Sequence, residues 1–110
     1  MREPPVLALL TETAPRSALA AGFEEEGVPL EVVLTEGSPE AMAREAAKRA
    51  AFGLGIGGDH DRLVLVLAAF SGRPYLEAKA TDARAMGHAA ARIAARRPLR
   101  VTRLQHEPTG

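Results

Sequence analysis

Residues 53–67 read GLGIGGDHDRLVLVL, and this stretch decides the fold. Its first half predicts a short strand at residues 54–57, and its apolar second half predicts another strand at residues 63–67. The turn Asp59-His60-Asp61 joins the two. A parallel return would need about a dozen residues or more, so these two strands must run antiparallel.

Strands and helices alternate along the rest of the chain. Short apolar or β-branched runs predict further strands at residues 6–10, 30–34 and 75–78. The intervening segments predict helices at residues 14–27, 41–51 and 81–96. This order predicts an α/β layered domain whose sheet is mixed rather than purely parallel.

Capping residues support these helix boundaries. Thr13 is expected to cap the first helix, and Gly27 is placed to end it in a left-handed conformation. Ser38, followed by a proline, is a strong helix start. Pro98 is expected to stop the last helix, with an extended segment at residues 99–104 and a frayed tail beyond it.

The composition fits one small soluble domain, which we expect to span residues 1–110. The absence of cysteine excludes a disulfide framework and cysteine-based metal sites. The start of the chain lacks the pattern of a secretory signal, and the longest apolar run is too short to span a bilayer. The 14 basic and 14 acidic residues balance, without the basic excess of a nucleic-acid binder. We therefore expect a cytoplasmic protein that binds neither nucleic acid nor membrane.

Gly53, Gly55 and Gly58 have the G-x-G-x-x-G spacing of dinucleotide-binding loops. In such loops the glycines follow a strand and open a helix whose N-terminus holds the pyrophosphate. Here the glycines lie within and after a strand, and an acidic turn leads into another strand. We therefore do not expect these glycines to form a dinucleotide-binding loop, and expect them instead to let a helix approach the sheet closely.

No group of side chains in the sequence predicts a catalytic centre. The Asp59-His60-Asp61 segment is better explained as a turn in which an aspartate bonds its own backbone. His88 lies among alanines within a helix and His106 lies near the end, and neither has an acid or nucleophile at an interpretable spacing. A basic patch suited to an acidic partner is formed by Arg96, Arg97, Arg100 and Arg103.

Glu24, Glu25 and Glu26 stand at the end of the first expected helix. A helix C-terminus carries partial negative charge, so acids there are unfavourable and lysine or arginine would be stabilising. Two explanations remain open: a solvated acidic helix end, or acids kept for a cation, which is either a basic partner or a metal ion. Replacing all three glutamates should modestly stabilise the free chain, because it relieves this conflict with the helix dipole.

Helical geometry limits the metal explanation. Successive residues turn by about 100°, so the three glutamates fan out and at most one of them can serve a given ion. A hard cation such as Mg²⁺ or Ca²⁺ would take its other oxygen ligands from elsewhere, most simply across a subunit interface.

Three segments, in order along the chain, resemble the small subunit of the diol and glycerol dehydratase reactivating factors. The first is GFEEEGVP at residues 22–29, close to the family's Gly-Ile-Glu-Glu-Glu-Gly-Ile-Pro. The second is GIGGDHDRLVL at residues 55–65, where the family has two apolar strands around an Asp-containing turn. The third is AAARI at residues 89–93 with RPLR at residues 97–100, similar to Asn-Ala-Ala-Arg-Leu and Ile-Pro-Phe-Arg. The first segment is fairly specific, and the resemblance spans residues 5–104.

The resemblance implies a three-layer α/β/α domain with a mixed five-stranded sheet, one strand antiparallel, in a topology like that of an anticodon-binding domain. The dehydratases' medium subunit shares this fold. The implied role is that of a non-catalytic subunit paired with a large, chaperone-like ATPase subunit. Together they would release damaged cobalamin from inactivated adenosylcobalamin-dependent dehydratase, by exchange or competition with its medium subunit.

The resemblance also assigns a role to the acidic triplet. It implies that Glu25 reaches a divalent cation, Mg²⁺ or Ca²⁺, held mainly by the large subunit, with Glu24 and Glu26 at the same interface. No cofactor is expected on this chain alone, and ATP belongs to the large subunit.

Two departures leave the partner open. Residues 11–16 and 70–74 differ from the family pattern, so the sequence does not decide between a diol and a glycerol dehydratase as target. One alternative is a dehydratase medium subunit, which is usually longer at its N-terminus. Another is a stand-alone α/β domain that binds a small molecule or nucleotide.

Overall fold

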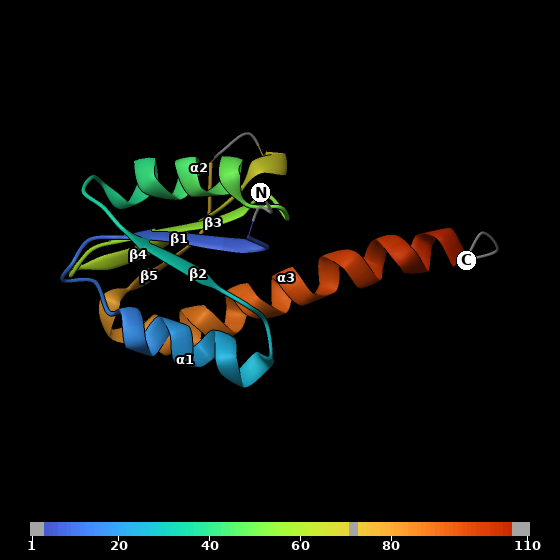
Figure 1. Cartoon of the computed structure of the whole chain (residues 1–110), viewed down its shortest axis with the longest axis horizontal. Coiled ribbons are helices and arrows are strands. Elements are labelled where there is room, and N and C mark those ends of the chain that lie inside the picture. The colour runs from blue at the N-terminus through green and yellow to red at the C-terminus, as the bar shows by residue number, and fades with distance from the viewer. Residues whose placement is uncertain (1–3, 71–72, 107–110) are drawn as a thin grey trace.

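A five-stranded sheet forms the centre of the protein (Figure 1). The computed structural model describes residues 4–70 and 73–106, with side chains described as far as residue 95. The strands are β1 (Val6–Leu10), β2 (Glu31–Leu34), β3 (Leu54–Gly58), β4 (Arg62–Leu67) and β5 (Pro74–Lys79), in the spatial order β2-β1-β3-β4-β5. β1 pairs in parallel with β2 and β3, whereas β4 is antiparallel to both β3 and β5. Among the described strands, β4 alone runs against the others, which confirms the mixed sheet expected from the short β3–β4 turn.

Helices cover both faces of the sheet. α1 (Arg16–Glu26) and α3 (Ala83–His106) lie on one face, and α2 (Pro39–Arg49) lies on the other (Figure 1). Short 3₁₀ helices at Ala68–Phe70 and Ala80–Asp82 follow β4 and β5. This arrangement confirms the predicted three-layer α/β/α fold. No described helix is long and apolar enough to cross a membrane.

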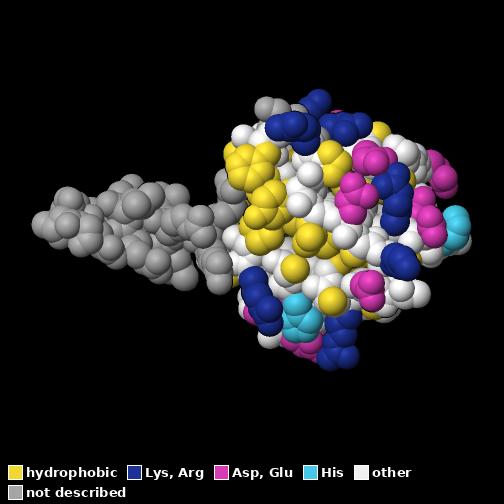
Figure 2. Space-filling model, turned by 180° about the vertical axis from the view of Figure 1, so that it is seen from behind, with side chains coloured by type: hydrophobic (Ala, Val, Ile, Leu, Met, Phe, Trp, Pro, Cys, Tyr) yellow, Lys and Arg dark blue, Asp and Glu magenta, His cyan; other side chains and the backbone are white. Residues whose placement is uncertain are grey.

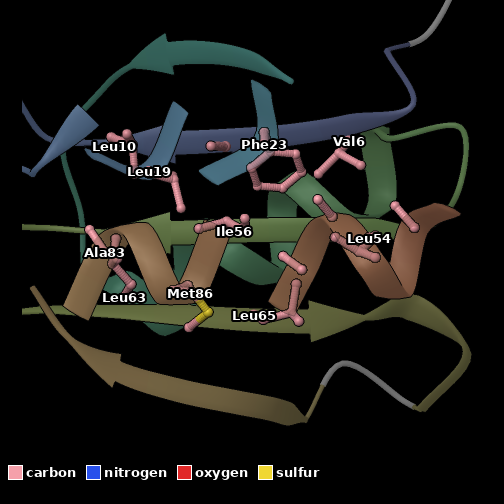
Figure 3. Close-up of a cluster of buried hydrophobic side chains, with 14 of the residues drawn as sticks. Val6, Leu10, Leu19, Phe23, Leu54, Ile56, Leu63, Leu65, Ala83 and Met86 are labelled. Atoms are coloured by element: carbon pink, nitrogen blue, oxygen red, sulfur yellow. The ribbon is translucent and has the colours of Figure 1, made fainter. Parts of the chain in front are cut away.

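Successive side chains of each strand point to opposite faces of the sheet, so the core is divided between the two helical layers. Ile56 and Leu65 point to the layer of α1 and α3, where they pack with Phe23 and Met86 (Figure 3). The intervening positions of β4, Val64 and Val66, pack against alanines of α2. The main core therefore lies under α1 and α3, and holds those two helices in place relative to the sheet.

Glycines in β3 let α2 lie directly on the sheet, as the sequence predicted. A Cβ atom added at Gly55 would lie 2.6 Å from the carbonyl oxygen of Ala43, and one at Gly57 would lie 2.5 Å from the Ala43 amide nitrogen. Neither distance leaves room for a side chain. The glycine pattern is therefore explained by helix–sheet packing.

The structure shifts the start of the first helix. α1 begins at Arg16, and Thr13 does not cap it; the Thr13 hydroxyl instead lies 3.5 Å from that of Thr11. The Ala14 amide bonds the Thr11 carbonyl, so a separate turn precedes the helix and leaves Thr13 too far from the first helical amides. By contrast, Ser38 caps α2 as predicted and accepts a hydrogen bond from the Ala41 amide at 3.3 Å.

The prediction that Pro98 ends the last helix is wrong. α3 continues to His106, so the extended segment expected at residues 99–104 is helical. Proline removes one helical hydrogen bond and disfavours a helix, but it does not forbid one, and α3 continues on both sides of it. The side chains of the basic patch at residues 96–103 and the tail at 107–110 lie outside the described residues.

Candidate functional site

The acidic triplet occupies the last turn of α1, where the sequence placed it. α1 ends at Glu26, and Gly27 follows with a positive φ of 73°. The Gly27 amide donates to the Glu24 carbonyl at 3.1 Å, and the Val28 amide donates to that of Phe23 at 3.1 Å. These bonds close the helix end with a left-handed cap and confirm that the carboxylates sit at the negative end of the α1 dipole.

A row of basic side chains on α3 faces two of these carboxylates. Arg84, His88 and Arg92 are spaced by four residues, so they share one face of the helix. That face meets Glu25 and Glu26 at the end of α1. We call these five residues the ion-pair cluster.

Arg84 and His88 both contact Glu25. The Arg84 Nε donates to Glu25 Oε1 at 3.2 Å, and its Nη2 pairs with the other carboxylate oxygen. The His88 Nε2 lies 2.5 Å from Glu25 Oε1. Both oxygens of the Glu25 carboxylate are therefore in contact with basic groups of the chain itself.

His88 and Arg92 contact Glu26. The His88 Nδ1 lies 2.8 Å from Glu26 Oε2, and the Arg92 Nε donates to the same oxygen at 3.0 Å. His88 thus bridges the two carboxylates, while each arginine serves one of them. Glu24 is exposed and makes no ion pair within the described part of the chain.

Direct backbone contact between α1 and α3 brings the cluster together. A Cβ atom at Gly22 would lie 2.7 Å from the His88 amide nitrogen, and one at Gly87 would lie 2.4 Å from the Leu19 carbonyl oxygen. Both distances are too short for a side chain at these positions. The glycine pair sets the helices close enough for the side chains of Glu25 and Glu26 to reach α3.

The ion-pair cluster offsets two charges that are unfavourably placed relative to the helix dipoles. Glu25 lies at the negative end of the α1 dipole, and Arg84, the second residue of α3, lies at the positive end of its helix. Pairing them gives each charge an opposite partner. The hydrogen bond from Arg84, and after it the contact with His88, lowers the pKa of Glu25, and Glu25 in turn raises the pKa of Arg84. The hydrogen bond with His88, assisted by Arg92, lowers the pKa of Glu26.

The sequence did not reveal the partners of His88. The prediction that this residue has no acid partner is wrong: Glu26 lies 62 residues earlier in the chain and in direct contact. The signal available was the spacing of Arg84, His88 and Arg92 on an alanine-rich helix, an unmatched basic row that needed an acidic counterpart. Periodicity alone does not say which distant segment supplies it.

The other candidate residues have structural roles. The Asp59 carboxylate accepts from the amides of Asp61 at 2.8 Å and Arg62 at 3.0 Å, so the acidic segment is a self-bonded turn as predicted. These two amides lower the pKa of Asp59. The Arg62 guanidinium then pairs with Glu40 at 2.6 Å and Glu77 at 3.4 Å, which joins the start of α2 to β4 and β5.

The surface beyond the cluster is partly apolar. Apolar side chains form a strip on the face shown in Figure 2, between groups of charged side chains and histidine at its margins. Phe70 and Tyr75, near the β4–β5 connection, are 51% and 49% exposed, with ring centroids 5.5 Å apart. Exposed aromatic side chains of this kind are typical of protein interfaces.

Among the described residues, no three histidine, aspartate or glutamate side chains are arranged to hold a metal ion. Glu25 nevertheless has the donor type that Mg²⁺ and Ca²⁺ prefer, a carboxylate at the surface. Since these ions take about six or more oxygen ligands, a cation at Glu25 would need further ligands beyond this part of the chain.

The chain is similar to known proteins in sequence and in fold. The sequence model described as dehydratase medium subunit matches residues 3–100. A solved structure titled "Glycerol dehydratase reactivase" matches with a TM-score of 0.74 and 23% identity, over 83% of this chain and 91% of that one. A structure of diol dehydratase-reactivating factor complexed with ADP and Mg²⁺ matches with a TM-score of 0.74 and 22% identity, over 86% of this chain and 94% of that one. The search of curated proteins gave no match.

Proposed function

Because the chain belongs to the dehydratase medium subunit family, we propose that it is the small subunit of a diol or glycerol dehydratase reactivating factor. In this role it has no catalytic activity of its own and acts in the cytoplasm beside a large, chaperone-like ATPase subunit. The pair acts on a dehydratase whose adenosylcobalamin has been damaged. The small subunit exchanges or competes with the dehydratase's medium subunit, and the damaged cobalamin is released.

The observation that carries this proposal is the acidic end of α1. Two carboxylates are held there at the surface by the α3 face, at the segment whose sequence most resembles the reactivating factors. The third resembling segment contains Arg92, which bonds Glu26 at 3.0 Å. Two of the segments that carry the resemblance are therefore in contact. The similar structures support the proposal further, since both are reactivating factors.

Within this proposal, Glu25 contributes a carboxylate oxygen to a divalent cation held mainly by the large subunit. Mg²⁺ or Ca²⁺ supplies positive charge that links the two subunits, and ATP stays on the large subunit. Glu24 and Glu26 lie at the same interface. The chain's own part is to present the Glu25 carboxylate at the surface, which the close α1–α3 contact supports.

The description of the matching family favours a second candidate, a medium subunit of the dehydratase itself. The two roles differ in their partners. A tagged chain expressed in its native host should recover a large ATPase subunit if it belongs to a reactivating factor. Recovery of dehydratase large and small subunits without the ATPase would overturn the first proposal and support the second.

The role of Glu25 has its own test. Glu25→Gln keeps the size of the side chain and removes its charge, so it should weaken the complex with the large subunit in Mg²⁺ and leave the fold intact. Glu24→Gln is the matched control, because it makes the same change one residue earlier, at a side chain outside the ion-pair cluster. Equal assembly by the parent and Glu25→Gln would show that Glu25 is not a ligand.

A further inference from the structure

The Glu25 carboxylate already has a cation, supplied by its own chain. Arg84 contacts both carboxylate oxygens, and His88 approaches one of them at 2.5 Å. An arginine that bonds both oxygens of a carboxylate forms a directional pair and neutralises its charge. An external cation that binds Glu25 must therefore compete with Arg84 for both oxygens and with His88 for Oε1.

The two cations cannot share the carboxylate at low cost. A guanidinium and a divalent ion on the same oxygens repel each other, because only a few ångströms separate them. One of the two must move away. Arg84 is the group free to move, since its side chain is 63% exposed compared with 38% for Glu25.

The rest of the cluster can keep the helices in place when Arg84 leaves. His88 and Arg92 remain bonded to Glu26, and the Gly22–Gly87 backbone contact does not involve the Arg84 side chain. Release of Arg84 therefore changes the charge at Glu25 without separating α1 from α3.

We infer that Arg84 is a displaceable counter-ion of Glu25: it holds the carboxylate in the free subunit and gives way when the partner's cation binds. This inference rests on the proposed function. It adds a competing residue on the same chain, which keeps Glu25 neutralised until the large subunit presents a stronger cation.

Affinity for the purified large subunit in Mg²⁺ tests the inference. Arg84→Gln removes the competitor and should tighten the complex by about two- to fivefold, the range expected for an exposed ion pair. Arg92→Gln is the matched control: it removes the same charge from the same helix face, at a residue bonded to Glu26 rather than Glu25. It should change the affinity by clearly less than Arg84→Gln. In a Glu25→Gln background, Arg84→Gln should have no further effect.

A second measurement uses the unmodified chain. The NMR signal of the Arg84 Nε–H should show a bonded group in the free subunit, and a solvent-exposed group once the large subunit and Mg²⁺ are added. If Glu25→Gln weakens the complex while Arg84→Gln leaves it unchanged or weakens it, the inference is overturned and the proposed function stands. If Glu25→Gln has no effect, the metal role of Glu25 fails, and the inference fails with it.

Discussion

Gly22 of α1 and Gly87 of α3 touch through their backbones: a Cβ atom on Gly22 would lie 2.8 Å from the Gly87 Cα. This contact determines how far apart the two helices lie. It therefore determines whether Glu25 and Glu26 can reach the basic row on α3. A methyl group at either glycine must push the helices apart, because the nearest atoms are backbone and cannot rotate away.

We expect Gly22→Ala and Gly87→Ala each to lower the free energy of unfolding by about 1–3 kcal/mol, the usual cost of overpacking. Urea denaturation measures this loss in the free energy of unfolding. Because both changes disturb one contact, the double variant should lose less than the sum of the two, with a coupling of at least about 0.5 kcal/mol.

Gly57→Ala supplies the control for that coupling, since Gly57 packs against α2 on the other face of the sheet. The combination of Gly22→Ala with Gly57→Ala should be additive. Additivity of Gly22→Ala with Gly87→Ala as well would show that the two glycines do not share a contact.

The three glutamates should respond differently to neutralisation. Glu24→Gln should raise the free energy of unfolding by about 0.5 kcal/mol, because it removes a negative charge from a helix C-terminus and breaks no described ion pair. Glu25→Gln and Glu26→Gln should not stabilise the chain, because each also removes contacts with α3. This replaces the simpler expectation that removal of all three acids is stabilising. Equal stabilisation by the three single variants would show that the ion-pair cluster contributes nothing.

Stability should fall in acid partly through this cluster. Contacts with α3 lower the pKa values of Glu25 and Glu26 from the ordinary value of 4.5. Near and below pH 4.5 the unfolded chain therefore binds more protons than the folded one at these sites, so the free energy of unfolding rises with pH there. The stabilisation is complete above that pH and is lost as the pH falls through the lower folded-state values.

The double variant Glu25→Gln, Glu26→Gln lacks these two groups, so its stability should decline less between pH 6 and pH 3. Thermal unfolding across this range measures the difference. Parallel curves for the parent and the variant would contradict the assignment.

The Ser38 cap offers a test of local structure away from the site. Ser38→Ala should cost about 1 kcal/mol of stability, because the Ala41 amide loses its side-chain acceptor. Ser17→Ala, an exposed serine in the first turn of α1, is the control and should cost much less. Equal effects would show that the cap bond does not contribute.

Local rules predicted most of the fold. The turn at Asp59 required antiparallel strands, Gly27 marked the end of α1, and Ser38 marked the start of α2. Each of these depends on neighbours within a few residues. The same rules failed at Thr13 and at Pro98, where a separate turn before α1 and the continuation of α3 overrode single-residue preferences.

Only the acidic half of the candidate site could be predicted from the sequence. The acids of α1 were recognised as electrostatically misplaced from their position in the helix alone. Arg84 is misplaced in the opposite sense at the start of α3, but no local pattern links it to Glu25, 59 residues earlier. The link depends on the Gly22–Gly87 contact, which belongs to the tertiary packing of two helices.

The most direct test of the account is the affinity of the chain for the large reactivating subunit, measured in Mg²⁺ for the parent, Glu25→Gln and Glu24→Gln. We predict that Glu25→Gln weakens the complex by about tenfold or more, as expected when one partner is lost from a charge contact that the subunit interface buries. Glu24→Gln, at the same interface but not a ligand of the cation, should weaken the complex by clearly less. No measurable complex with the parent chain, or equal affinities for the parent and Glu25→Gln, would contradict the account.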